Sequence, residues 1–154
     1  MRQQLLRKNF FGFLIAIIFY LGAAEKAQAQ WVLIPDTNFR KAIAVLVPSA
    51  ISGNNMDTTN TQIINMTSLD VSSKSIKDLT GVQYFKSLKT LNCSNNSLSF
   101  LPPLSSTITH LDCSYNSLVT LHDLPVSINY LDCTTNSLTS LPALPLHLPL
   151  YIVD

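Results

Sequence analysis

The sequence predicts a solenoid of the α/β class with little helix, in which short parallel strands stack into one sheet. Two observations carry this prediction. The chain matches itself at a shift of twenty residues without any slip of register. Around residues 91–93, apolar and polar positions alternate with the period of two that is typical of a strand. Because the repeat length is fixed, successive strands must lie parallel and in register, which gives a curved stack with the strands on its concave side.

The repeat consists of columns of identical residues that recur in three copies. These columns are Leu91, Leu111 and Leu131; Cys93, Cys113 and Cys133; Asn96, Asn116 and Asn136; Leu98, Leu118 and Leu138; Leu101, Leu121 and Leu141; Leu104, Leu124 and Leu144. An earlier copy is offset by twenty-two residues and begins at Leu69. Residues 63–154 therefore hold about four complete units and part of a fifth.

Each unit reads LxxLxCxxNxL, as in residues 88–98, which resembles the leucine-rich repeat consensus with cysteine at its sixth position. The inward apolar residues are expected to stack into continuous columns. The asparagine of each unit is expected to turn inward and to satisfy backbone groups that the bend after the strand would leave unpaired. Asn96, Asn116 and Asn136 are thus predicted to be structural.

The segment after each strand distinguishes the subfamily. Residues 101–104 read LPPL and residues 141–145 read LPALP, so prolines stand where other repeats carry a helix, and an extended convex side is expected. This pattern resembles the shortest bacterial leucine-rich repeats, of the LPxLP type. Residues 78–85 of the first unit contain no proline, and a helical turn is expected there.

Residues 30–62 are predicted to form an N-terminal helical cap. Phe39, Ile43 and Leu46 are spaced as one face of an amphipathic helix, which Asp36 or Thr37 can cap and Pro48 ends, and residues 49–60 are expected to be loop. Such a helix covers the open apolar edge of a solenoid. Residues 31–40 also resemble the N-terminal cap of secreted Bacteroidetes-type leucine-rich repeat proteins, which implies such a source.

Residues 1–29 have the features of a secretory signal peptide. Three basic residues precede an uncharged run over residues 10–24, and Ala27-Gln28-Ala29 provides the small-x-small cleavage pattern. The alternative is a membrane anchor, but fifteen residues fall short of the roughly 18 to 20 that cross a bilayer. We therefore expect export to the periplasm, cell surface or medium, with no stable membrane insertion of the mature chain.

The other end of the sequence predicts an open edge. Leu148, Tyr151 and Val153 occupy strand positions of the fifth unit, and the sequence ends at Asp154 before a cap. A strand edge of this kind associates with a partner or a second copy, so either self-association through this uncapped end or truncation of a longer product is expected.

The composition offers little for catalysis or for nucleic-acid binding. Removal of residues 1–29 leaves six basic and eight acidic groups and no glutamate. A mildly acidic chain is a poor partner for nucleic acid. No C-x-x-C pair, Cys/His cluster, glycine-rich phosphate loop or nucleophile-base pair occurs, so we expect no enzyme activity, no catalytic residues, no metal and no cofactor. The three cysteines are expected to be buried thiols, because parallel strands point their Cβ atoms the same way.

The outward residues of the concave face are the candidate ligand-binding residues. They are Asn92, His110, Asp112, Tyr115, Tyr130 and Asp132. His110 and Tyr130 occupy one column and could form a stacking platform. Asp112 and Asp132 occupy another column about 5 Å apart, which indicates a cationic ligand, with screened surface carboxylates as the alternative.

Three functions fit these features. The first is an exported, non-enzymatic module that recognises a protein or peptide ligand through its concave face, as the family resemblance implies. The second is the repeat half of an effector that lacks its catalytic domain, because some LPxLP proteins carry a ubiquitin-ligase domain. The third is a structural or adhesive fragment of a larger surface protein.

Export predicts a defined mature N-terminus. The charged start, short apolar run and Ala-x-Ala pattern together should direct cleavage after Ala29, so mass spectrometry of secreted material should find a chain that begins at Gln30. Recovery of an intact Met1 on a membrane-embedded product would restore the anchor interpretation.

Overall fold

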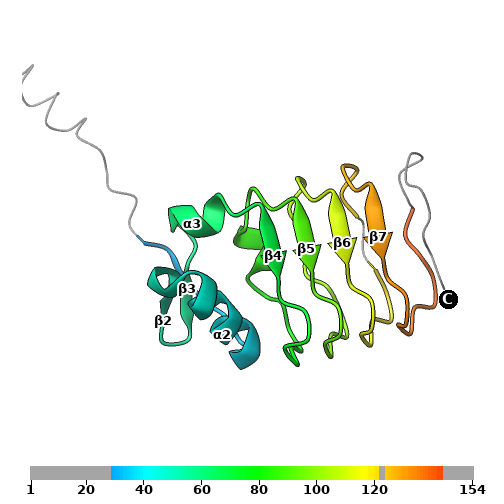
Figure 1. Cartoon of the computed structure of the whole chain (residues 1–154), viewed down its shortest axis with the longest axis horizontal. Coiled ribbons are helices and arrows are strands. Elements are labelled where there is room, and N and C mark those ends of the chain that lie inside the picture. Colours follow the sequence, from blue (N-terminus) through cyan, green and yellow to red (C-terminus); the bar gives the residue numbers. More distant parts are fainter. Residues whose placement is uncertain (1–28, 122–123, 144–154) are drawn as a thin grey trace, which may run out of the picture.

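Four short parallel strands form the main sheet of the protein (Figure 1). The computed structural model describes residues 29–121 and 124–143. The strands of this sheet are β4 (Ser68–Asp70), β5 (Thr90–Asn92), β6 (His110–Asp112) and β7 (Tyr130–Asp132). They lie side by side in chain order, each one repeat after the last, as Figure 1 shows.

The register of the sheet follows the sequence repeat. The central leucine of each strand pairs with the central leucine of the next, from Leu69 through Leu91 and Leu111 to Leu131. The predicted parallel, in-register stack is therefore confirmed for the described strands. The twenty-two-residue offset of the first unit also fits, because its two extra residues lie outside the strand.

The buried interior consists of the columns that the repeat predicts. Leu91, Leu111 and Leu131 lie on the core side with the cysteines two positions later, and Cys93, Cys113 and Cys133 are buried free thiols, as expected. Burial is the main reason that the pKa of Cys93 rises to about 12, and burial also raises the pKa of the other two thiols. The cysteines therefore act as small apolar core residues.

In the second, third and fourth units, the recurring asparagine of the repeat bonds its own turn to the preceding unit. The Asn116 side-chain amide donates to the carbonyls of Cys113 and Ser114 in its own unit and to that of Cys93 in the unit before, each at 3.1 Å. Its Oδ1 accepts the Leu98 N–H of the preceding unit at 3.0 Å. Asn96 and Asn136 make the corresponding bonds, so the predicted structural role of the asparagines is confirmed.

A second set of side chains, which sequence reasoning missed, bonds adjacent repeats to one another just before each strand begins. The Thr107 hydroxyl lies 2.7 Å from the carbonyl oxygen of Leu88 and 3.2 Å from that of Lys86, so its one proton binds either of them. The Ser127 hydroxyl, twenty residues later, has the same position relative to the carbonyls of Ser106 and Ile108. These hydroxyls replace bonds that a convex helix would provide, since residues 101–105 contain neither helix nor strand.

The first repeat carries the helical turn expected within residues 78–85, as the 3₁₀ helix η2 (Val82–Tyr84). Gly81 precedes it with φ of 116°, a conformation that side chains rarely adopt. A Cβ at this position would overlap Cδ1 of Ile34. The glycine thus allows the N-terminal unit to pack closely against the first repeat.

The N-terminal unit contains the predicted helix, observed as α2 (Thr37–Leu46). Asp36, not Thr37, is its N-cap and accepts from the N–H groups of Asn38 and Phe39, both at 2.8 Å. The other oxygen of Asp36 accepts the Lys77 N–H at 2.8 Å, which ties the helix to the loop after β4. One carboxylate therefore both starts the helix and fastens it to the repeats.

Two details of the N-terminal prediction were wrong. Leu46 was expected on the buried helix face, but it is 49% exposed and Val47 is buried instead, because the helix ends at Leu46 and the chain turns Val47 inward. Residues 49–60 were expected to be loop, but they contain a hairpin. A short 3₁₀ helix, η1 (Pro48–Ala50), leads into it.

The hairpin joins β2 (Ile51–Ser52) to β3 (Asn55–Asp57), and β3 also pairs with β1 (Trp31–Leu33) in a three-stranded antiparallel sheet. The missed signal was Gly53-Asn54, a two-residue turn, with φ of 58° at the glycine. The short helix α3 (Thr61–Ile64) follows and spans the boundary expected between residues 62 and 63.

Several sequence predictions lie outside the described residues. These are the signal peptide up to residue 28 and the fifth-unit strand with Leu148, Tyr151 and Val153, on which self-association was predicted. In the part of the chain that is described, no helix is long and apolar enough to span a membrane.

Replacing the middle asparagine should destabilise the fold strongly. Asn116→Ala leaves the Leu98 N–H without its partner and removes one of the two asparagine amides that donate to each of the Cys93 and Cys113 carbonyls, which should cost about 3 kcal/mol of unfolding free energy in urea titrations. Asn129→Ala, at an exposed position, is the control. Equal stability of the two variants would contradict the role given to Asn116.

The buried thiols predict a loss of stability at alkaline pH. The Cys93 thiol titrates near pH 12 when folded and near 9.0 when unfolded, so the folded state holds the proton more tightly. Its contribution is fully present below pH 9 and is lost as the pH rises toward 12, by up to about 1.4 kcal/mol per pH unit. Urea titrations between pH 8 and 10.5 should show a shallower decline for Cys93→Ala than for the wild type. Parallel declines would place this thiol in contact with water.

Candidate functional site: the outer face of the parallel sheet

The side of the parallel sheet opposite the buried leucines is here called the outer sheet face. Its side chains come from the residues immediately before and after each central leucine, because successive strand residues point to opposite sides. Paired positions form two columns across the strands. The columns are Ser68, Thr90, His110 and Tyr130, and Asp70, Asn92, Asp112 and Asp132.

His110 and Tyr130 form a stacked aromatic pair on this face. Their ring centroids are 5.9 Å apart and their planes differ by 21°. A contact of 3.0 Å between Thr109 Oγ1 and His110 Nδ1 fixes the orientation of the imidazole. Burial, with the negative charges of Asp132 and Asp112, raises the pKa of Tyr130, so its hydroxyl is protonated at neutral pH and can donate a hydrogen bond.

The next column has a structural role that sequence reasoning missed. Oδ1 of Asp112 accepts from both the N–H and the hydroxyl of Ser114, at 3.0 and 2.7 Å. Asp132 makes the same pair of bonds with Thr134, and Asn92 makes it with Ser94. The missed signal was Asp or Asn followed by Ser or Thr two residues later, which is an Asx turn.

These turns weaken the repulsion argument for a cationic ligand. Asp112 and Asp132 are paired residues of adjacent strands, but each carboxylate has one oxygen held by two donors. The two charges can therefore stand side by side without a bound cation. The bonds also hold both side chains in a fixed direction, which lowers the entropic cost of binding a ligand at the remaining oxygens.

The aromatic and acidic residues surround a shallow hollow of about 230 Å³. Its lining residues are Thr90, Leu91, Asn92, His110, Asp112 and Tyr130. Four of the six residues predicted from sequence thus meet at one place. Asp132 lies beside the hollow in the same column as Asp112.

The sixth predicted residue, Tyr115, lies in the turn after β6 and does not line the hollow. Its side chain is 60% exposed and its φ is 52°, in the left-handed region that costs a tyrosine roughly 1 kcal/mol or more. Ser73, Asn95 and Thr135 adopt the same conformation at the equivalent positions. The repeat geometry therefore imposes this conformation on whichever residue stands there.

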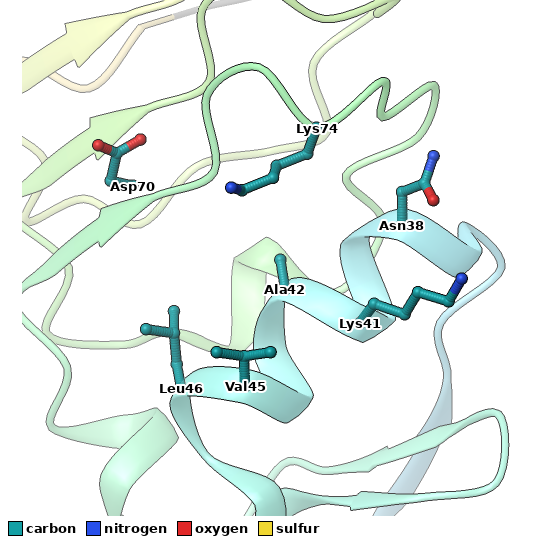
Figure 2. Close-up of a pocket in the computed structure, with 7 residues that line it drawn as sticks. All are labelled: Asn38, Lys41, Ala42, Val45, Leu46, Asp70 and Lys74. Carbon is teal, nitrogen blue, oxygen red and sulfur yellow. The ribbon is translucent and has the colours of Figure 1, made fainter.

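A second hollow, of about 380 Å³, lies between α2 and β4 (Figure 2). Ala42, Val45 and Leu46 point toward it from the helix, and Lys74 extends across it from the loop after β4 toward Asp70, as Figure 2 shows. Lys41 and Asn38 complete the lining. Hydrogen bonds from Ser72, together with the charge of Lys74, lower the pKa of Asp70, which is therefore ionised.

Sequence reasoning did not predict this second hollow, because it placed Leu46 in the core. The one available signal was the run Ala44-Val45-Leu46, in which apolar residues fill more than one face of the helix.

The described residues contain no group of three or more His, Cys, Asp or Glu side chains that could hold a metal ion. In the same part of the chain every buried side-chain nitrogen or oxygen has a hydrogen-bond partner. The potential nucleophiles are the cysteine thiols, whose burial and raised pKa keep them protonated. In the described part of the chain the arrangement thus offers surfaces for binding, and its buried thiols are not activated as nucleophiles.

Comparison with known proteins relates the fold to one solved structure in particular. The chain is 30% identical to the functional domain of InlJ from Listeria monocytogenes, which includes a cysteine ladder, and the match has a TM-score of 0.64. The alignment covers 75% of this chain and 26% of that one. Neither a scan of protein-family models nor a search of curated proteins found a match. The chain thus has a leucine-rich-repeat fold and spans about a quarter of the length of the structure it resembles.

Proposed function

We propose that this chain is an exported, non-enzymatic recognition module that binds a protein or peptide through its outer sheet face. The observation that carries the proposal is the stacked His110–Tyr130 pair beside Asp112 at a hollow on an otherwise regular sheet. Paired aromatic rings supply contact area at low entropic cost, and a fixed carboxylate supplies specificity.

The contrast between the two sides of the strands favours this proposal. Core-facing positions repeat the same leucines, cysteines and asparagines, whereas the column before each central leucine changes from Ser68 through Thr90 to His110 and Tyr130. The fold does not require this variation, since the side chains of this column stand outside the core. A surface whose composition the fold leaves free is available for a ligand.

A cationic segment is the preferred ligand in this proposal. Asp112 and Asp132 each keep one carboxylate oxygen outside the Asx turn, and the charges of both act on the Tyr130 hydroxyl. A basic side chain could pair with these oxygens and stack on the ring. Export through the predicted signal peptide and a Bacteroidetes-type source belong to the same proposal, on the sequence features given above.

Two alternatives remain distinct from this function. A structural or adhesive fragment of a longer surface protein would use the repeats as a spacer, and the coverage of 26% of the InlJ domain is the observation that favours it. The repeat half of an effector would require a catalytic domain elsewhere in a longer product. A spacer predicts no dependence of ligand binding on the outer sheet face.

Two substitutions borrowed from neighbouring repeats test the proposal without disturbing the fold. Asp112→Asn reproduces the residue of the same column at position 92, which makes the same Asx turn, and Tyr130→Thr reproduces Thr90. In quantitative pull-downs from cell-surface extracts, Tyr130→Thr should weaken capture of a ligand at least tenfold, and Asp112→Asn should reduce both affinity and its decrease with salt.

Val126→Ser is the control, because Val126 is 83% exposed on a loop away from the strands. Ligands that are retained equally by all three variants would place the binding surface elsewhere and favour the spacer.

A further inference from the structure

The hollow beside α2 contains apolar surface that the fold leaves uncovered. Val45 is 81% exposed and Leu46 is 49% exposed, although both belong to a helix that packs its other face into the core through Phe39 and Ile43. With Ala42 they form the apolar wall of the hollow of about 380 Å³. A cavity of this size accepts one large apolar side chain with its flanking backbone.

The charges around this hollow are opposite in sign to those at the other end of the sheet. Lys41 and Lys74 outnumber Asp70 in the lining of the hollow beside α2. At β6 and β7, the column contains Asp112 and Asp132. The outer sheet face therefore runs from a basic, apolar end at α2 to an acidic, aromatic end at β7.

The two hollows also lie on neighbouring strands of the same sheet. Asp70 of β4 lines the hollow beside α2, and residues of β5, β6 and β7 line the hollow at His110 and Tyr130. Adjacent strands lie about 4.8 Å apart, so Asp112 stands roughly 10 Å from Asp70 and Asp132 roughly 14 Å. An extended peptide that crosses the strands covers this span in about three to four residues at roughly 3.3 Å each.

From these observations we propose that the partner is a protein segment in extended conformation that crosses the strands with a defined polarity. One large apolar side chain occupies the hollow beside Val45 and Leu46, an acidic residue next to it pairs with Lys74 or Lys41, and a basic residue about three to four positions away pairs with Asp112 and Asp132. This inference rests on the proposed function and specifies its ligand. The order of the apolar, acidic and basic residues in the peptide follows from the basic end of the outer sheet face at α2, its acidic end at β7 and the distance between these ends.

The probe for the test is a random twelve-residue peptide library displayed on phage. The library is selected for binding to the immobilised protein that begins at Gln30. Enriched peptides should share a Leu, Ile, Met or Phe beside Asp or Glu, with Lys or Arg about three to four positions from the acidic residue. Each enriched peptide is then synthesised and titrated against the wild type, Tyr130→Thr, the double variant Val45→Ser/Leu46→Ser, and Lys74→Glu.

The double variant should weaken binding at least tenfold and Lys74→Glu at least threefold. Leu33→Ser, which alters a leucine that is 56% exposed and lies outside both hollows, should leave binding unchanged. A peptide in which the acidic and basic residues are exchanged should also bind at least tenfold more weakly than the original peptide. This loss should hold whether the peptide runs from β4 to β7 or from β7 to β4.

The outcomes separate this inference from the function on which it rests. Peptides that lose binding with Tyr130→Thr but not with the double variant would overturn the inference and leave the outer sheet face as the binding surface. Peptides that are indifferent to both variants would overturn the inference and the proposed function together. Failure to enrich any peptide, or enrichment without the acidic-apolar pair, would also overturn the inference.

Discussion

The hydrogen-bonded asparagine of the repeats that contain β5, β6 and β7 is the interaction on which the rest of this structure depends. The described residues 101–105 carry no helix, so the chain that returns from one strand to the next cannot satisfy its own backbone groups through helical bonds. The Asn116 side chain provides both a donor and an acceptor for these backbone groups. Its amide donates to carbonyls of two repeats, and its oxygen accepts the Leu98 N–H. Loss of register by one residue would break every bond of this kind.

Register explains how a repetitive sequence produces one differentiated surface. With the leucines of β4 to β7 paired directly, residues one repeat apart become neighbours, twenty-two positions between β4 and β5 and twenty between the later strands, and a column in the sequence becomes a column in space. The same constraint brings His110 onto Tyr130 and Asp112 beside Asp132. The Asx turns then fix the direction of the carboxylates. Binding chemistry on this face is thus a consequence of the repeat length and of two or three variable residues per unit.

The parallel sheet, its register and its core could be predicted because periodicity is a global property of the sequence. The positions of Leu91 and Cys93 recur in the later copies of the repeat, so a coincidental match in one copy does not change the predicted register. The placement of His110 and Tyr130 on one face followed from the same regularity. The binding of a ligand to this pair stays a prediction.

The N-terminal unit was less predictable because it occurs once and has no repeat to reinforce its signals. The Gly53-Asn54 turn was read as loop, since the strands that flank it are only two and three residues long. Leu46 was placed in the core because helical spacing alone cannot show where a helix ends. The structural role of Asp112 was missed for a different reason. Its carboxylate was interpreted as a ligand-binding group because it lies on the predicted face, although it accepts the backbone N–H of Ser114, two residues later.

The account's central claim is that asparagine side chains, rather than helices, hold the repeats in register. Amide hydrogen exchange of the wild-type chain at neutral pH tests this claim most directly, read by nuclear magnetic resonance at Leu98 and Leu118. Both N–H groups lie outside the strands and donate to asparagine oxygens at 3.0 Å. The account predicts protection comparable to that of Cys93 and Cys113, whose N–H groups donate to strand carbonyls at 2.8 Å. Exchange of Leu98 and Leu118 at the rate of an unstructured peptide would contradict it.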